Sequence, residues 1–251
     1  MSTKFFNNGL GHTLFDKLKG IASEMTTFDR FLAVVGFFRS SGYFKLRKEL
    51  GDVSEIKILV GINIDDIFRK HNKALLMLAD AEKAKEIYHE GFKEDIVNAQ
   101  YAPEVEKGIL QMCEDLVSGR LQVRIHATKN LHAKFYLCLP ENHNEHSDGW
   151  VIMGSSNISD SGLGVTRSPR YELNVAMKDY DDVKFCSDEF WKLWEEAIPL
   201  TAEDIDKYQS QTYLGYQPTP YELYIKVLID TFGDQAEDDC TIQLHDGVKD
   251  L

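Results

Sequence analysis

Three short segments of the chain carry side chains that could act together on a phosphate group. His132 and Lys134 stand two residues apart among apolar neighbours, and alternate residues of a strand point to the same face. A second apolar run ends in a glycine, after which Ser155 and Asn157 begin a turn of small polar residues. Glu172 opens a third strand-like run. We therefore expect three adjacent strands to bring a base, a cation, two small polar groups and a carboxylate to one phosphate site.

Other histidines are weaker candidates for chemistry. His71 and Lys73 repeat the same spacing, but no similar polar turn follows them, so we place them on the surface. His143 and His146 could ligate a metal from one helix, but no third or fourth ligand is near them in the sequence. We therefore expect no metal and no other cofactor.

The first sixty residues follow an α/β pattern. Residues 12–25 have apolar side chains at helical spacing, and residues 31–38 are nearly all apolar, which predicts a strand buried on both faces. Residues 43–50 are predicted to form a second helix, and residues 55–61 a second buried strand. A strand, a helix and a strand in this order predict a right-handed parallel crossover.

The rest of the chain is less regular. Residues 4–9 predict a short extended segment, residues 121–125 a strand, and residues 181–194 a helix that carries Phe and Trp on its core side. Residues 65–119 are polar with helical patterning. Residues 234–251 are acidic and poor in apolar side chains, which is typical of a linker.

Composition sets limits on the class of protein. A chain of 251 residues with 43% hydrophobic residues can bury a substantial core. Its net charge of −13 argues against a broad basic surface, so any contact with nucleic acid needs a local positive patch. There is no long apolar run and no signal-peptide pattern, and we expect a soluble, cytoplasmic protein that does not act at a membrane. Widely spaced free thiols are expected at all four cysteines: Cys113, Cys138, Cys186 and Cys240.

The motifs resemble the signature of a known superfamily. The chain resembles the phospholipase D superfamily in three features: His132-x-Lys134, Gly154-Ser155-x-Asn157 and the later Glu172. This resemblance implies an α/β sandwich, with a mixed and mostly parallel sheet flanked by helices on both faces, and cleavage of phosphodiesters without metal. Leu139 stands where the longer form of the motif has an aspartate, and single-motif nucleases of the superfamily can lack that aspartate. The nuclease branch is therefore favoured over the lipid branch.

The resemblance also implies a pair of chains. The superfamily mechanism uses two histidines, one that attacks phosphorus and one that protonates the leaving oxygen, and this chain carries one motif copy. We therefore expect a homodimer in which two copies of His132 face each other across a twofold axis. Lys134 and Asn157 would stabilise charge on the phosphoryl oxygens, and Glu172 would orient the imidazole. Ser155 would either donate to the same oxygens or only cap the turn.

Nucleic acid is the expected substrate, with DNA favoured over RNA. Arg167 and Arg170 flank the site in a loop, and Arg39 follows a buried strand, so these three are expected to contact a phosphate backbone. A lipid substrate is less favoured, because the chain has no basic amphipathic helix with which to bind a membrane.

A finer resemblance concerns the amino-terminal segments. Residues 6–11, 35–42 and 58–63 look like the phospholipase-D-like module that precedes the motor of bacterial superfamily 2 helicases. The chain has no phosphate-loop motif, so a downstream helicase-like region would supply the motor. We expect residues 1–198 to form the phosphodiesterase domain and residues 199–251 a helical extension and linker. The alternative to an enzyme is a non-catalytic module that binds nucleic acid and dimerises a helicase.

Overall fold

One mixed β-sheet forms the centre of the molecule. The structure is a computed structural model that describes residues 4–9, 11–61, 111–112, 114–126, 131–166 and 170–200. The sheet has the strand order β1-β7-β6-β5-β2-β3-β4-β8. Its strands are β1 (Phe5–Asn7), β2 (Arg30–Val35), β3 (Glu55–Gly61), β4 (Leu121–His126), β5 (Phe135–Leu139), β6 (Trp150–Gly154), β7 (Leu173–Met177) and β8 (Ile198–Pro199). The helices with assigned bounds are α1 (Leu14–Glu24), α2 (Ser40–Leu50), α6 (Asp160–Leu163) and α7 (Tyr180–Glu196).

The predicted strand–helix–strand unit is confirmed. β2 and β3 pair in parallel with α2 between them in sequence, and Phe31 lies opposite Ile56 in the register. Both strands are buried along almost their whole length, which explains their continuous apolar runs. The predicted α1, β4 and α7 are also present, and the extended segment at the amino end is the edge strand β1.

The sheet is mixed, but the expectation that it is mostly parallel was wrong. Only the β2–β3 and β3–β4 pairs are parallel among the described strands. β5, β6 and β7 form an antiparallel run, and β2 pairs antiparallel with β5. The loop between β5 and β6, residues 140–149, contains no helix, so it makes a hairpin instead of a crossover.

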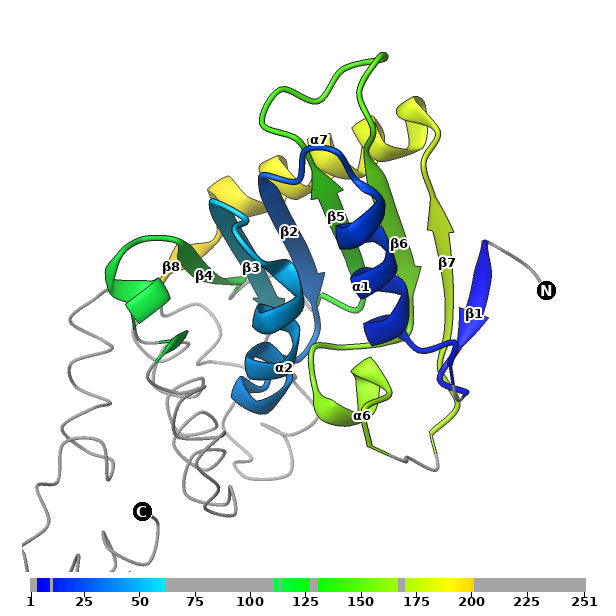
Figure 1. Cartoon of the computed structure of the whole chain (residues 1–251). Coiled ribbons are helices and arrows are strands. Elements are labelled where there is room, and N and C mark those ends of the chain that lie inside the picture. The colour runs from blue at the N-terminus through cyan, green and yellow to red at the C-terminus, as the bar shows by residue number, and fades with distance from the viewer. Residues whose placement is uncertain are drawn as a thin grey trace, which may run out of the picture.

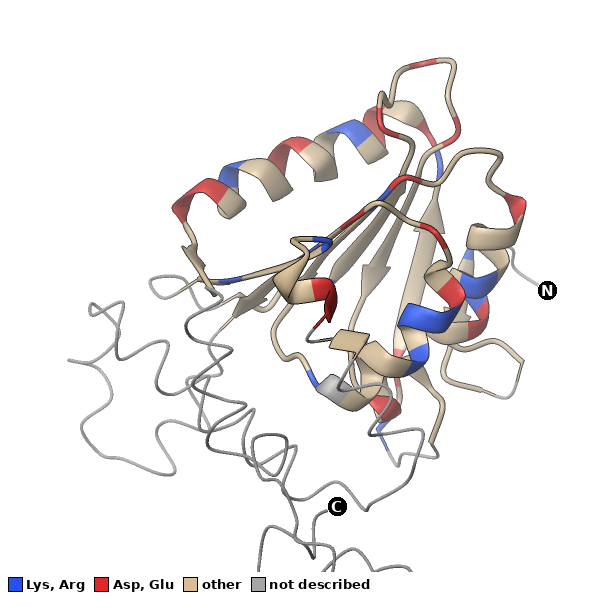
Figure 2. Cartoon of the chain, turned by 60° about the vertical axis from the view of Figure 1, so that its left-hand side comes forward, with Lys and Arg blue, Asp and Glu red and all other residues tan. Residues whose placement is uncertain are grey.

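Helices cover both faces of the sheet. Figure 1 shows α1, α2 and α6 in front of the sheet and α7 behind it, and Figure 2 shows the same two layers from the side. On the front, α1 buries Leu14, Leu18 and Ile21 at helical spacing. Its first turn is held by a capping box between Thr13 and Asp16. Each fully buried aliphatic side chain contributes roughly 1.5–3 kcal/mol to folding.

α7 alone covers the rear face among the described residues. It buries Val183, Cys186, Phe190 and Trp194 against the rear side chains of β2, β3, β5 and β6. Phe190 and Trp194 are therefore core, as their spacing predicted, and Trp191 is partly buried. The prediction was wrong for Phe185, which is 66% exposed. Cys186 and Cys138 are buried free thiols, and burial raises the pKa of both.

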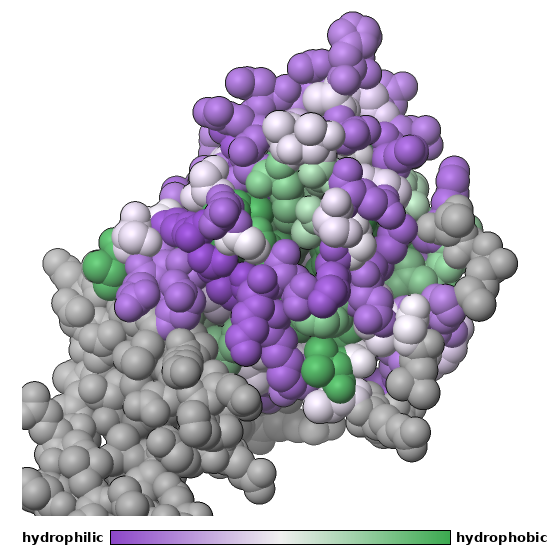
Figure 3. Space-filling model, in the orientation of Figure 1, coloured by the Kyte–Doolittle hydropathy of each residue, from purple (hydrophilic) through white to green (hydrophobic). Residues whose placement is uncertain are grey.

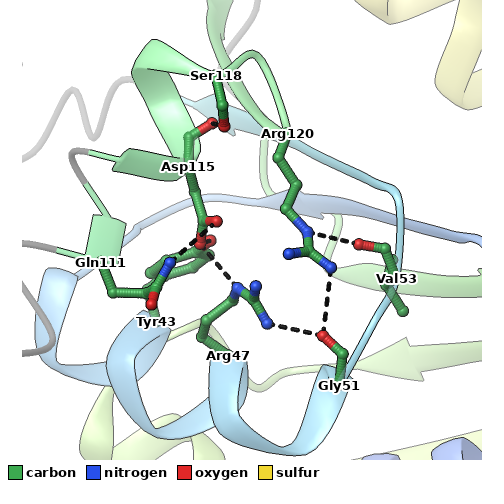
Figure 4. A network of polar contacts seen from close by, with 8 residues as sticks. All are labelled: Tyr43, Arg47, Gly51, Val53, Gln111, Asp115, Ser118 and Arg120. Atoms are coloured by element: carbon green, nitrogen blue, oxygen red, sulfur yellow. Dashed lines mark hydrogen bonds and ion pairs between the residues drawn. The ribbon is translucent and has the colours of Figure 1, made fainter.

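A buried ion pair connects α2 to the helical residues 114–117. The Asp115 carboxylate accepts hydrogen bonds from the Tyr43 hydroxyl at 2.8 Å and from Arg47 Nε at 2.7 Å (Figure 4). Arg47 and Arg120 both donate to the Gly51 carbonyl oxygen, where α2 ends. Burial and the Asp115 carboxylate raise the pKa of Tyr43 well above its usual range.

Several expectations fall outside the described residues. They concern residues 62–110, which include most of the polar stretch 65–119 with His71 and Lys73, as well as Arg167 and residues 201–251 of the predicted extension. Within the described part of the chain, no helix combines the length and the apolar character needed to cross a membrane.

Candidate active site

The motif residues meet at one end of the sheet. The carboxyl ends of β2 and β6 lie next to the amino ends of β5 and β7, because these neighbours run antiparallel. The register pairs Val34 with Phe135, Phe135 with Met153, and Gly154 with Asn174. The segments that continue from these four strand ends are therefore neighbours along the lower edge of the sheet in Figure 1.

His132 and Lys134 precede a strand and do not lie on one. β5 begins at Phe135, so the prediction that both residues occupy a strand was wrong. The chain before β5 crosses the ends of β2 and β3, where the Leu131 carbonyl oxygen lies close to the glycine at each end. His132 is exposed, Lys134 is half-buried, and Lys134 Nζ donates to the His132 carbonyl oxygen at 2.8 Å.

Gly36 is where Lys134 and Asn157 come together. A β-carbon on Gly36 would lie 3.6 Å from Lys134 Cε, 3.6 Å from Asn157 Oδ1 and 3.1 Å from the Leu131 carbonyl oxygen. The missing side chain therefore leaves room for the Lys134 side chain and the Asn157 amide beside the backbone that directly follows β2. The sequence motifs do not by themselves indicate this role of Gly36.

The amide of Asn157 is held in one orientation. Its Oδ1 accepts a hydrogen bond from the Phe37 backbone N–H at 3.0 Å. With the oxygen bound to the backbone, the amide NH₂ group remains as a donor. Asn157 can therefore donate to an anion beside Lys134.

Ser155 and Glu172 are hydrogen-bonded to each other. The Ser155 hydroxyl donates to Glu172 Oε2 and accepts from the Leu173 backbone N–H at 3.1 Å. Because a hydroxyl has one proton, a phosphate oxygen could bind Ser155 as an acceptor only by replacing the Glu172 carboxylate. This contact fits the turn-capping role of Ser155, and it gives Glu172 a partner other than the imidazole of His132 that we expected.

A buried polar network below the turn was not foreseen. Tyr136 donates to the Ser156 carbonyl oxygen at 2.6 Å, and Asn174 Nδ2 donates to Ser156 Oγ at 3.0 Å. All three side chains are buried, and burial together with the nearby Glu172 raises the pKa of Tyr136. A β-carbon on Gly154 would lie 2.2 Å from Asn174 Oδ1, so this close contact requires the glycine of the motif.

The expected arginines lie around the same end of the sheet. Arg39 follows β2, is exposed, and lies over the Phe37 ring at 4.6 Å. Arg170 is exposed, and its carbonyl oxygen accepts a hydrogen bond from Asn8 Nδ2 at 2.7 Å. Asn8 also accepts from the Glu172 backbone N–H at 3.4 Å, so it holds the segment that leads into β7. No motif in the sequence pointed to this role of Asn8.

A separate pocket lies at the opposite end of the sheet. Its volume is about 340 Å³, and its lining includes Arg30, His143, Lys184 and Trp191. None of the predicted site residues lines it. His143 packs on the Tyr180 ring at 5.4 Å, and burial lowers its pKa. Among the described residues, no group of three or more His, Cys, Asp or Glu side chains could hold a metal ion.

Comparison with protein families gives one match. Residues 54–194 fit the family described as cardiolipin synthase, phospholipase D-like domain. The matched range is more than half of the chain, and it contains His132, Lys134, Ser155, Asn157 and Glu172. No curated protein matches the chain.

Several solved structures are similar at low identity. TrmBL2, an archaeal chromatin protein with a novel mode of DNA binding, has a TM-score of 0.40, 14% identity, and coverage of 78% of this chain and 54% of its own. Nuc from Salmonella typhimurium, a phospholipase D family member, has a TM-score of 0.44, 10% identity, and coverage of 80% and 98%. Phosphatidylserine synthase from Haemophilus influenzae has a TM-score of 0.49, 11% identity, and coverage of 92% and 45%. The chain thus spans about half of TrmBL2 and of the synthase, and nearly all of Nuc.

Proposed function

The chain belongs to the phospholipase D-like domain family named for cardiolipin synthase, and we propose that it is a metal-independent phosphodiesterase that cuts nucleic acid. The observation that carries this proposal is the approach of Lys134 and Asn157 to one point over Gly36, beside the exposed His132. A cation and an amide donor next to an imidazole are what a phosphoryl group needs for binding and attack.

The proposed reaction has two steps and uses two copies of His132. In the first step, one imidazole attacks phosphorus and forms an N–P bond while the P–O bond to the leaving group breaks. The leaving oxygen takes a proton from the imidazolium of the partner's His132. Water then attacks phosphorus and gives its proton to that second imidazole, and the N–P bond breaks to release the phosphate monoester.

Fixed groups of the protein would stabilise the transition state. Lys134 supplies a positive charge and the Asn157 NH₂ group supplies a hydrogen bond to the phosphoryl oxygens. Ser155 joins them if a phosphate oxygen replaces Glu172 as its acceptor. Glu172, released from Ser155, would then orient an imidazole, either in its own chain or across the dimer.

DNA is the substrate that we propose, in spite of the net charge of −13. Arg39 and Arg170 are exposed near the site end and could contact phosphates that flank the cleaved bond. The resemblance of the amino-terminal segments supports a role beside a helicase-like motor in a longer protein.

A non-catalytic role in nucleic-acid binding and dimerisation is the alternative. The hydrogen bond between Ser155 and Glu172 favours it, because it occupies two of the proposed catalytic groups with each other. The net charge of −13 also favours this alternative slightly.

Cleavage of plasmid and single-stranded DNA in the presence of EDTA tests the proposal. We expect wild-type cleavage to persist in EDTA and to be lost in His132→Ala, because fixed cations replace a metal and the nucleophile has been removed. His146→Ala is the matched control, since His146 is an exposed histidine in the loop at the other end of the sheet, and it should cleave normally. Binding without cleavage by all three proteins would support the non-catalytic role, and loss of wild-type cleavage in EDTA would contradict the metal-independent mechanism. A soluble choline ester tests the lipid-type reaction in parallel.

A further inference from the structure

Tyr171 is an exposed aromatic residue beside the candidate active site. It directly precedes Glu172, and it is 70% exposed, more than any other large hydrophobic residue in the described part of the chain. Its ring belongs to neither of the two core clusters that hold the sheet and the helices together. Neither packing nor the proposed reaction therefore accounts for this side chain.

The backbone around Tyr171 is held in place on both sides. Asn8 Nδ2 donates to the Arg170 carbonyl oxygen at 2.7 Å, and Asn8 Oδ1 accepts from the Glu172 backbone N–H at 3.4 Å. β7 then begins at Leu173, which is bonded to the turn after β6 through both its N–H and its carbonyl oxygen. The ring is thus attached to a fixed backbone, and only its two side-chain torsions need to be ordered when a ligand binds.

The apolar side chains Leu173 and Met153 lie next to this segment. Leu173 is 50% exposed and Met153 is 39% exposed. Met153 lies opposite Phe135, which packs in the rear cluster with α7, so Met153 is on the rear side of the sheet. In Figure 1, α7 crosses behind the upper part of the sheet and leaves the lower part of β7 without a described helix behind it. In contrast, the front of the molecule is largely hydrophilic where its residues are described (Figure 3).

The charge around the motif is positive, although the whole chain is acidic. The segments that meet at this end of the sheet carry three cations and one carboxylate: Lys134, Arg39, Arg170 and Glu172. Asp160, at the start of α6, is paired with Lys45 at 3.0 Å, and on α7 Glu189 is paired with Lys192 at 3.4 Å. An aromatic ring beside Glu172 is therefore also a ring beside cations that can bind phosphates.

An exposed ring beside cations is the combination with which proteins bind single-stranded nucleic acid. The cations follow the phosphates, and the ring stacks on the face of an unpaired base. In a duplex, both faces of each base are covered by the neighbouring bases, so a stacking residue would first have to separate them at a cost in free energy. The surroundings of Tyr171 therefore favour a single strand over a duplex.

We propose that Tyr171 is a specificity-determining residue, which stacks on an unpaired base next to the cleaved bond and makes single-stranded DNA the preferred substrate. The inference rests on the proposed function, which places the cleaved phosphate at Lys134 and Asn157. The base that flanks this phosphate then lies on the Tyr171 ring, and Arg170 contacts the next phosphate. Tyr171 contributes binding and orientation, and it takes no part in the transfer of protons.

Binding of labelled oligonucleotides, measured by fluorescence anisotropy in EDTA, tests this role. Each protein carries His132→Ala so that the DNA stays intact, and the probes are a single strand and the duplex of the same sequence. We expect the single strand to bind more tightly than the duplex. Adding Tyr171→Ala should weaken single-strand binding by about tenfold and leave duplex binding nearly unchanged, whereas Tyr171→Trp should bind normally, because an indole ring also stacks on bases.

Phe185→Ala is the matched control for the loss of an exposed aromatic ring. Phe185 is 66% exposed on α7, which crosses behind the upper part of the sheet, and its neighbours at helical spacing are the acidic residues Asp182 and Glu189. This variant should bind both probes as its parent does. Circular dichroism of each variant checks that the fold is retained.

A single strand that lacks one base tests the contact itself. An abasic nucleotide is placed at each position of the strand in turn, and cleavage is measured with His132 intact. Next to the cleaved bond, the missing base should raise KM by about tenfold with little change in kcat when Tyr171 is present. It should cause no further loss in Tyr171→Ala, because the ring and the base act as a pair.

The results separate this role from the proposed function. If Tyr171→Ala binds the single strand as its parent does, or if the duplex binds more tightly than the single strand, the stacking role is overturned, and cleavage by the wild type would still support the phosphodiesterase. If single-strand binding depends on Tyr171 in a protein that does not cleave DNA, the stacking role is supported and the enzyme is contradicted. Absence of binding to either probe would overturn both.

Discussion

At the scale of single residues, the approach of Lys134 and Asn157 depends on the absence of a side chain at Gly36. The nearest atom to a β-carbon there would be the Leu131 carbonyl oxygen at 3.1 Å, which is tighter than ordinary van der Waals contact. The segment that carries His132 and Lys134 would have to shift by a few tenths of an ångström. Catalysis depends on positions at this level of accuracy.

Gly36→Ala should therefore reduce DNA cleavage by about tenfold or more, with little change in stability. The measurement is kcat and KM for cleavage, together with the urea midpoint of unfolding. Gly20→Ala is the control, because a β-carbon on Gly20 in α1 would meet nothing within 4 Å. Equal cleavage by both variants would show that Gly36 does not set the geometry of the site.

The sequence predicted which residues of the site meet, but not how they are bonded. The motif spacing predicted that His132, Lys134, Asn157 and Glu172 share one site, and the structure places them at one end of the sheet, while their catalytic roles stay a prediction. It could not show that Lys134 precedes β5 or that Ser155 bonds Glu172, because both depend on how other strands end nearby. Tyr136 looked like an ordinary strand residue, since its acceptor, the Ser156 carbonyl oxygen, is twenty residues away.

At the scale of elements, apolar patterning identified β2, α2, β3, β4 and α7 but not the directions of the strands. Buried strands have the same apolar runs whether their neighbours are parallel or antiparallel. The direction was decided by connections such as the hairpin between β5 and β6, whose polar loop has no helix to make a crossover. The antiparallel pairing matters for function, because it brings the carboxyl ends of β2 and β6 to the amino ends of β5 and β7.

The position of α2 depends on the ion pair between Asp115 and Arg47. Asp115→Ala should lower the free energy of unfolding by about 3 kcal/mol, because it leaves the Arg47 guanidinium and the buried Tyr43 hydroxyl without their acceptor. Asp115→Asn should lower the free energy of unfolding by less, since its amide oxygen can still accept the hydrogen bond from Tyr43. Urea unfolding followed by tryptophan fluorescence measures both variants, and equal stability of Asp115→Ala and the wild type would refute this role.

At the scale of the whole molecule, composition predicted a large core and an acidic surface. It could not show where acidic and basic side chains lie on that surface. The net charge of −13 includes residues throughout the chain, and Figure 2 shows acidic and basic residues interspersed along α7. The exposed apolar side chains Phe5, Met153 and Leu173 were also beyond prediction, because they come from β1, β6 and β7, and only the register shows that they share one side of the sheet.

The covalent intermediate gives the most direct test of the shared site. Cleavage of labelled DNA by the wild-type protein, stopped by rapid denaturation at alkaline pH to preserve a phosphohistidine, should leave the label on His132. The account predicts a maximum of one labelled chain in two, because one histidine of each pair attacks while the other acts as the acid. Label on a different residue, or cleavage by His132→Ala at the wild-type rate, would contradict it.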